Sequence, residues 1–180
     1  MNKIYEPAED SHLMTNSLKR NIPKLIEKNP HLKILEIGSG SGIQLKTLLE
    51  LGIKKNNITC CDLNNKAIEH CKELGFNCIK SNLFENIKEK YNIIIFNPPY
   101  LPEDKNEPED SRLATTGGKK GSEIINKFLK DAKKYLSQDG IIFLLTSSLS
   151  KDIDFLDYYI ELVAKKKIFF EELFIWELKI

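Results

Sequence analysis

Short apolar runs alternate with amphipathic stretches along the chain, which is the pattern of a largely parallel sheet covered by helices. Turn residues such as Gly, Asn and Asp bound the runs, and they predict where each buried strand ends. The expected strands are residues 33–37, 57–61, 76–80, 92–96, 140–146 and 173–179, with one more at an open register within 159–170. We therefore expect an α/β fold with a seven-stranded, mostly parallel sheet and helices on both faces.

Helical periodicity fills the segments between these strands. It is clearest in residues 122–136, whose apolar stripe we interpret as core packing rather than as part of a site. The other expected helices pass through 13–18, 43–49 and 64–74, and one starts within 152–158. Asp10 or Ser11 would cap the first helix, because their side chains accept hydrogen bonds from free backbone amides.

The segment 101–120 is long and polar, and it contains five acidic residues. A loop of this length in a compact domain is usually either functional or disordered. We interpret it as a mobile lip over a substrate, with plain disorder as the alternative.

The composition fits one soluble domain. The chain has 180 residues, 41% of them hydrophobic, and no compositional break divides it, so we expect a single domain over 1–180. Lys and Arg total 27 against 26 Asp and Glu, which predicts no strong attraction to nucleic acid. No apolar run reaches the roughly 20 residues of a membrane span, and no signal sequence opens the chain, so we expect a cytoplasmic protein without membrane contact.

The chain has four cysteines, to which we assign no chemistry. They are Cys60, Cys61, Cys71 and Cys78, and their spacings match no zinc pattern. We expect reduced, partly buried thiols and no metal.

The most distinctive stretch is Asn-Pro-Pro-Tyr at 97–100, directly after the apolar run 93–96. Two prolines remove backbone donors and stiffen the path of the chain, which leaves main-chain carbonyls free to accept hydrogen bonds. The Asn97 amide oxygen and the Pro98 carbonyl would form two acceptors for an NH2 group, and Tyr100 would offer a ring face to a planar ligand. The alternative is a strand end with a rigid turn, which a bare Asn-Pro pair favours.

Other strand ends carry candidate ligand-binding residues. Gly38 and Gly40, in a glycine-serine loop after the first strand, permit close approach to the backbone, although the spacing is neither a dinucleotide fingerprint nor a P-loop. Asp62 ends the second strand, where it would accept both hydroxyls of a ribose or simply cap the next helix. Asn82 and Leu83 follow the third strand and would contact an adenine, or serve as a loop polar residue and a core leucine. Because the carboxyl ends of parallel strands share one edge, we expect these strand ends to face one pocket.

In this order, the motifs at 35–42, at Asp62, at 81–84 and at 97–100 resemble those of class I S-adenosylmethionine-dependent methyltransferases that act on planar nitrogen. The segments 5–11 and 117–125 are similar to the HemK-related branch of eukaryotes and archaea. That branch methylates the glutamine of the Gly-Gly-Gln motif in class 1 translation release factors. The resemblance covers nearly the whole chain and implies a single Rossmann-like methyltransferase domain with S-adenosylmethionine as cofactor.

The resemblance also implies site residues by position. Residues 1–30 would form an N-terminal helical extension that contributes to the cofactor site. Asn97, Pro98 and Tyr100 would act on the substrate amide. The implied cofactor-binding residues are Ser11, Glu36, Gly38, Gly40, Asp62, Asn82, Leu83 and Asn97.

Three positions depart from the family pattern. Asn82 stands where Asp is more frequent, and it keeps an acceptor for an adenine. Thr115 stands where a Trp often precedes the double glycine, and His12 stands where an aromatic residue is common. The last two departures bear on how a substrate is positioned.

Other functions fit the same motifs. An adenine-amine methyltransferase of DNA or RNA would use the 97–100 corner equally well, although such enzymes usually carry a basic surface or an added domain. A protein lysine methyltransferase is a further alternative, and a scaffold without turnover is the non-enzymatic one. The resemblance also implies a small zinc-binding activator protein, which would add strands at the sheet edge formed by 76–80.

Overall fold

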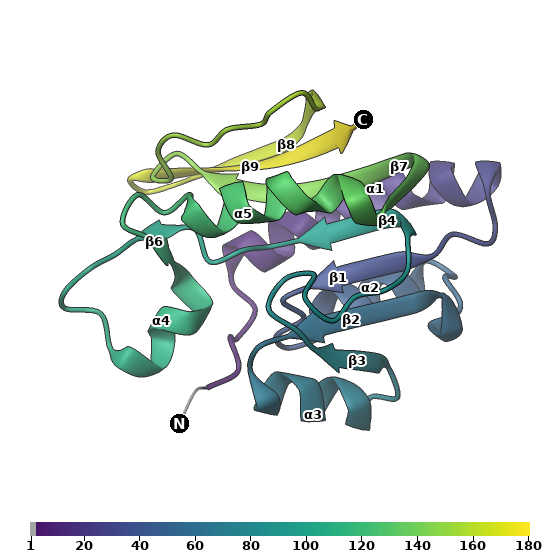
Figure 1. Ribbon diagram of the computed structural model, residues 1–180, viewed down its shortest axis with the longest axis horizontal. Helices are drawn as coiled ribbons and strands as arrows, with labels where there is room; N and C mark the ends of the chain where they lie inside the picture. The colour runs from purple at the N-terminus through teal and green to yellow at the C-terminus, as the bar shows by residue number, and fades with distance from the viewer. Residues whose placement is uncertain (1–2) are drawn as a thin grey trace.

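A seven-stranded sheet with helices on both faces forms the body of the computed structural model, which describes residues 3–180 (Figure 1). The strand order is β3-β2-β1-β4-β7-β9-β8, with parallel pairing from β3 to β7 and antiparallel pairing of β9 with β7 and β8. The strands are β1 (Ile34–Ile37), β2 (Ile58–Asp62), β3 (Asn77–Lys80), β4 (Tyr91–Phe96), β7 (Leu136–Ser147), β8 (Tyr159–Ile168) and β9 (Glu171–Lys179). The mostly parallel sheet predicted from the sequence is confirmed.

Five α-helices connect or flank these strands within the described residues. They are α1 (Glu9–Lys28), α2 (Ile43–Glu50), α3 (Asn65–Glu73), α4 (Glu109–Thr115) and α5 (Glu123–Ala132). Single 3-10 turns occupy Lys55–Asn57 and Lys133–Tyr135, and a small second sheet pairs β5 (Leu101–Pro102) with β6 (Thr116–Gly118). Among residues 3–180, no helix is both long enough and apolar enough to span a bilayer.

Two hydrophobic cores lie on opposite faces of the sheet. In β4, Ile93 and Ile95 enter the core formed with α1, α2 and α3, whereas Ile94 and Phe96 enter the core formed with α5. All four side chains are buried, because helices cover both faces of this central strand. Its continuous apolar run thus holds Asn97 at the end of a rigid, doubly covered element.

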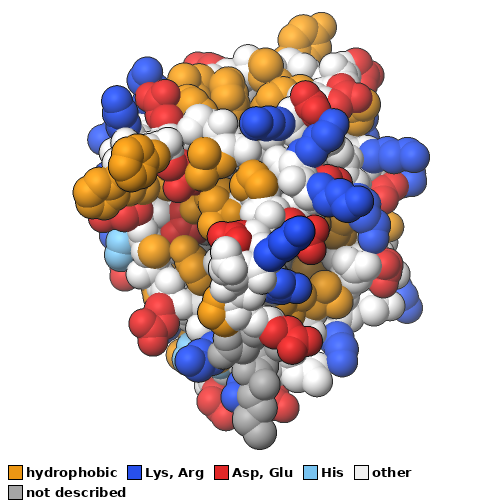
Figure 2. Space-filling view, turned by 90° about the vertical axis from the view of Figure 1, so that its left-hand side faces the viewer, with side chains coloured by type: hydrophobic (Ala, Val, Ile, Leu, Met, Phe, Trp, Pro, Cys, Tyr) orange, Lys and Arg blue, Asp and Glu red, His pale blue; other side chains and the backbone are white. Residues whose placement is uncertain are grey.

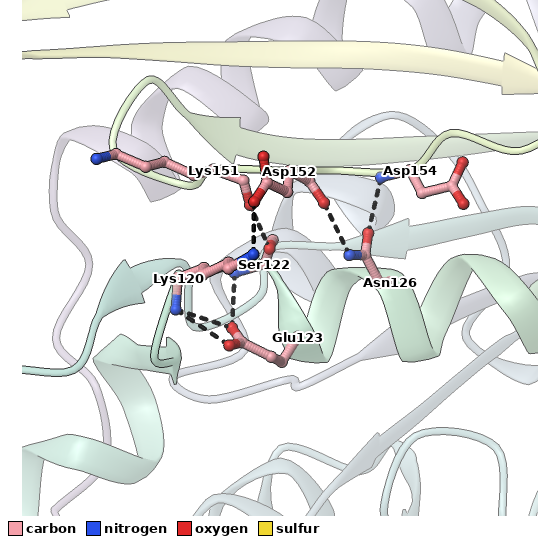
Figure 3. A network of polar contacts seen from close by, with 7 residues as sticks. All are labelled: Lys120, Ser122, Glu123, Asn126, Lys151, Asp152 and Asp154. Carbon is pink, nitrogen blue, oxygen red and sulfur yellow. Dashed lines mark hydrogen bonds and ion pairs between the residues drawn. The ribbon is translucent and has the colours of Figure 1, made fainter.

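Residues 151–158 form no helix, contrary to the sequence prediction. Asn126 of α5 donates through Nδ2 to the Asp152 carbonyl (3.0 Å) and accepts through Oδ1 from the Asp154 amide (2.9 Å), as Figure 3 shows. These bonds occupy backbone groups that a helix would pair internally. Tertiary contacts therefore override a helical pattern that is at most two turns long.

Two further predictions are wrong. The segment 101–120 is not structureless, since it contains β5, α4 and β6. The first helix starts at Glu9, with Ala8 at the capping position and no side-chain cap, so Asp10 and Ser11 lie inside its first turn. Both side chains are buried there, which leaves them available to the site described next.

Candidate functional site

A cavity lies at the carboxyl ends of β1, β2 and β4. The space between its walls is about 780 Å³, including the part that is open to solvent. Its walls come from the N-terminal segment, the glycine loop after β1, the ends of β2 and β4, and α4. The lining residues are Lys3, Tyr5, Asp10, Ser11, Glu36, Gly38, Ser39, Gly40, Ser41, Ile43, Gln44, Asp62, Asn64, Ala67, Asn97, Pro98, Pro99, Leu113 and Ala114.

The glycine loop folds back onto the end of β2. The amides of Gly38 and Ser39 both donate to the Cys61 carbonyl, at 2.8 and 3.1 Å. The Gly40 amide donates to Asp62 Oδ2 at 2.9 Å. Gly40 has a φ of 48°, in the left-handed region where glycine is favoured, so the loop can present bare backbone to a ligand.

Asp62 joins the loop to the helix that follows β2. Its Oδ1 accepts from the Asn64 amide at 2.8 Å, while the Asn64 side chain caps α3 by accepting from the Lys66 amide at 3.1 Å. Capping is therefore the role of Asn64. Each carboxylate oxygen of Asp62 keeps a further lone pair for a ligand hydroxyl. Burial raises the Asp62 pKa, so a donor from a ligand would compensate lost solvation.

Glu36 is a buried carboxylate on the cavity wall, at the middle of β1. Its Oε2 has no hydrogen-bond partner among the described residues. Burial, with the nearby Cys71 and Asp62, raises the Glu36 pKa well above the usual range. An orphaned acceptor of this kind is costly unless a ligand donates to it, which marks Glu36 as a polar contact for a bound molecule.

Asn97 meets the first turn of α1 across the cavity wall. Its Nδ2 donates to Asp10 Oδ2 at 3.0 Å, and its Oδ1 is buried without a partner in the described structure. Asp10 is itself fixed, because its Oδ1 accepts from the Tyr5 hydroxyl (3.1 Å) and from the Ser11 amide (2.7 Å). A carboxylate only accepts, so Asp10 selects the amide orientation that leaves the Asn97 oxygen for a donor.

The proline corner is braced by the glycines at 117–121. A Cβ at Gly117 would lie 2.6 Å from the Pro99 carbonyl oxygen, and one at Gly121 would lie 2.3 Å from the Tyr100 carbonyl oxygen. Side chains are therefore excluded at both positions. The same segment is tied down by Glu123, whose carboxylate accepts from the Lys120 and Ser122 amides (Figure 3).

Several predicted site residues come together in the cavity, and others do not. Ser11, Glu36, Gly38, Gly40, Asp62, Asn97 and Pro98 line it. Asn82 lies outside the lining and donates to Glu85 Oε1 at 2.7 Å, and Leu83 is buried in the core formed with α5. Tyr100 packs between both cores, and burial raises its pKa. The structure thus brings the glycine loop, the two carboxylates and Asn97 together, without Asn82, Leu83 or Tyr100.

Some cavity residues were missed from the sequence. Tyr5 and Asp10 belong to the segment 5–11, for which the sequence predicted helix capping at Asp10 or Ser11 and a resemblance to a family, but no site role for these two residues. Leu113 and Ala114 come from α4, a helix within the segment expected to be a loop. This helix has only seven residues, which is too short to give a clear helical period within a long polar segment.

The four cysteines are free and buried, more completely than predicted. The sulfurs of Cys60, Cys71 and Cys78 lie within 4.8 Å of one another, behind the glycine loop. Cys71 Sγ is 3.5 Å from Ser39 Oγ, so this thiol cluster supports the loop from the core side.

Comparison with known proteins gives a consistent set of relatives. The methyltransferase small domain model matches residues 11–167. A Methanocaldococcus jannaschii protein named as a protein N5-glutamine methyltransferase is 35% identical over 96% of this chain and 90% of that relative. The eRF1 methyltransferase catalytic subunit mtq2 of Schizosaccharomyces pombe is 29% identical over 82% of this chain and 74% of its own. Among solved structures, the E. cuniculi Mtq2-Trm112 complex, described as methylating the eRF1 translation termination factor, superposes with a TM-score of 0.72 at 24% identity, covering 97% of both chains.

Proposed function

Because the chain belongs to the methyltransferase small domain family of class I S-adenosylmethionine-dependent methyltransferases, we propose that it methylates a glutamine side-chain amide. The glutamine is that of the Gly-Gly-Gln motif in a class 1 translation release factor. The observation that carries this proposal is the buried Asn97 Oδ1, which has no hydrogen-bond partner among residues 3–180 and is set by Asp10 as an acceptor on the cavity wall. The name of the M. jannaschii relative supports a glutamine as the acceptor, and the name of the S. pombe relative supports eRF1 as the kind of protein substrate.

The cavity residues fit S-adenosylmethionine. Asp62 offers carboxylate lone pairs for the ribose hydroxyls, and Glu36 offers a donor on the cofactor an oxygen that no described residue contacts by a hydrogen bond. Gly38 and Gly40 have no side chains, so the cofactor could approach the backbone of the loop at these two positions. When bound, S-adenosylmethionine supplies a methyl group on a positively charged sulfur.

Asn97 would prepare the acceptor nitrogen. The nitrogen of a glutamine amide is a weak nucleophile, because its lone pair is delocalised into the carbonyl, so orientation matters as much as proximity. The Asn97 oxygen and the Pro98 carbonyl would each accept one hydrogen of the NH2 group. As the nitrogen–methyl bond forms and the bond between the methyl group and the sulfur breaks, these acceptors would stabilise the positive charge that develops on the nitrogen. The nitrogen would then release a proton to solvent, to which the cavity is partly open.

Methyl transfer to purified proteins and nucleic acids tests the proposal. The protein is incubated with methyl-labelled S-adenosylmethionine and either a release factor or duplex DNA. We expect label in the release factor and none in the DNA. The adenine-amine alternative would instead place the label in DNA, and that outcome would overturn the proposal.

Glu36→Gln is expected to weaken cofactor binding by about tenfold or more, since a donor from the cofactor would favour the ionised carboxylate and an amide cannot take on that charge. It should also change the pH dependence of stability. Burial raises the Glu36 pKa, so the unfolded chain releases this proton at a lower pH than the folded protein does. Stability that depends on the protonated carboxyl is therefore present below the ordinary carboxyl pKa and is lost as the pH rises toward the raised value.

Calorimetric titration of the cofactor and thermal unfolding without cofactor, at about pH 5 and about pH 8, check both effects. The wild type should lose melting temperature relative to the Glu36→Gln variant between the two pH values. Parallel pH profiles for the two proteins would contradict the assignment of a buried, cofactor-facing carboxylate.

We also propose that a small zinc-binding partner pairs with the free edge of β3. The strand is at the end of the sheet, and its Asn77 and Lys80 are exposed. An edge strand leaves backbone donors and acceptors available for strand addition. Co-expression followed by gel filtration should give a co-eluting complex with higher activity, and a monomer that is fully soluble and active alone would count against it.

A further inference from the structure

Two phenylalanines form the turn between β8 and β9. Ile168 pairs with Glu171, so Phe169 and Phe170 are the whole connection, and they are 90% and 99% exposed. Tight two-residue hairpin turns favour Asn-Gly or similar pairs. Phe169 even adopts a left-handed backbone (φ 44°), which bulky residues rarely do. The chain thus places two large apolar rings where water contact is greatest.

This tip lies on the same edge of the sheet as the cavity. Phe96 is level with Leu144 on β7, and the next residue of β7, Leu145, pairs with Ile175 on β9. Asn97 follows Phe96, so it lies beside Leu145 and Ile175 across the sheet. Phe170 comes five residues before Ile175, and the hairpin therefore extends five residues beyond Asn97. With about 3.3 Å per strand residue and about 4.8 Å between strands, the tip stands roughly 20 Å from Asn97. Figure 2 looks onto this edge, where hydrophobic side chains gather across the middle and project at the left.

The hairpin is held in place by contacts with the end of β7 and with α1, whose first turn contributes to the site. Ser147 Oγ donates to Glu171 Oε1 at 2.6 Å, and the Glu172 amide donates to Ser148 Oγ at 2.9 Å. Lys166 forms an ion pair with Glu9, the residue before Asp10 in α1. The tip of the hairpin therefore has a defined position relative to Asn97.

We propose that Phe169 and Phe170 dock a folded domain of the protein substrate while its glutamine reaches Asn97. This rests on the proposed function, since a polypeptide that enters the cavity must also cover this edge. A standard protein interface occupies about 800 Å² on each partner, a patch roughly 30 Å across, which includes both the cavity mouth and the tip. Lys165 and Lys166 already pair with Glu172 and Glu9, so the apolar rings rather than these charges are offered to the partner.

The experiment compares two double variants of the full chain. Phe169→Ser with Phe170→Ser removes the docking rings, and because both are exposed the fold should not depend on them. Tyr159→Ser with Ile160→Ser is the matched control, since these exposed residues (76% and 48%) lie at the far end of β8. Steady-state methyl transfer is measured with an intact release factor and with a short peptide containing Gly-Gly-Gln.

The tip variant is expected to raise the KM for the intact release factor about tenfold or more, with kcat and cofactor affinity unchanged. Its kinetics with the peptide and those of the control variant should match the wild type. An unchanged KM for the intact protein would overturn the docking proposal alone. If the wild type is a dimer in gel filtration and the tip variant is a monomer, the rings bind a second copy of the chain. That result would also overturn the docking proposal. No transfer by the wild type to either substrate would overturn the proposed function itself.

Discussion

Replacing Asn97 with alanine is expected to lower kcat by about a thousandfold while S-adenosylmethionine binding stays within a few fold. The buried Oδ1 is the acceptor that would orient the substrate amide and stabilise charge on its nitrogen. Removing one preorganised polar group from a site of this kind costs about 10²–10³ in rate. The cofactor should keep its contacts with Glu36, Asp62 and the glycine loop, so the loss falls on the chemical step.

Single-turnover transfer and cofactor titration measure the two quantities separately. Asn92→Ala is the matched control, because Asn92 lies at the opposite end of β4 and accepts from the Lys33 amide, far from the cavity. It should transfer methyl groups at the wild-type rate. Turnover of the Asn97→Ala variant close to that of the control would show that Asn97 does not act on the acceptor.

The Asp10→Asn variant is expected to lose about 10–100-fold in kcat with a smaller change in substrate KM. Asp10 is a positioning residue, since its carboxylate holds Asn97 Nδ2 and thereby fixes the amide orientation. An asparagine at this position could both donate and accept, so Asn97 would populate both orientations. Only one of them presents the oxygen to a substrate.

Tyr5→Phe provides a graded comparison for Asp10. The Tyr5 hydroxyl donates to Asp10 Oδ1, and the Ser11 amide still holds that oxygen when the hydroxyl is removed. The Tyr5→Phe variant should therefore lose less kcat than the Asp10→Asn variant. If Asp10→Asn changes only the stability of the protein and leaves kcat intact, the contact with Asn97 is structural and the positioning role is wrong.

Most of the sheet was predictable because buried parallel strands consist of apolar runs. β4 illustrates this, since helices on both faces require apolar side chains at Ile93 through Phe96. The segment 151–158 was not predictable, because its backbone is held by Asn126. No local pattern encodes a bond to a side chain 26 or 28 residues away.

Part of the site was predictable because ligands bind at the carboxyl ends of parallel strands. Gly38, Asp62 and Asn97 follow neighbouring parallel strands, and the sheet brings them to one cavity. Asn82 obeys the same rule, yet its side chain turns to Glu85 on the surface. Strand order fixes which ends meet, but local turns decide which side chains enter the cavity.

The contact of Asp10 with Asn97 shows the same limit over a longer distance. The two residues are 87 positions apart, and the first turn of α1 must pack beside the end of β4 before they meet. A short acidic motif near the start of the chain gave no hint of this contact from periodicity or composition. Only the packed structure assigns Asp10 to the orientation of Asn97.

In the proposed reaction, a glutamine amide held by Asn97 receives a methyl group in this cavity. Mass spectrometry of a release factor co-expressed with the protein tests it most directly. We expect one added methyl on the glutamine of the Gly-Gly-Gln motif with the wild type and none with Asn97→Ala. A methyl group on another residue, or an unmodified glutamine beside an active enzyme, would contradict it.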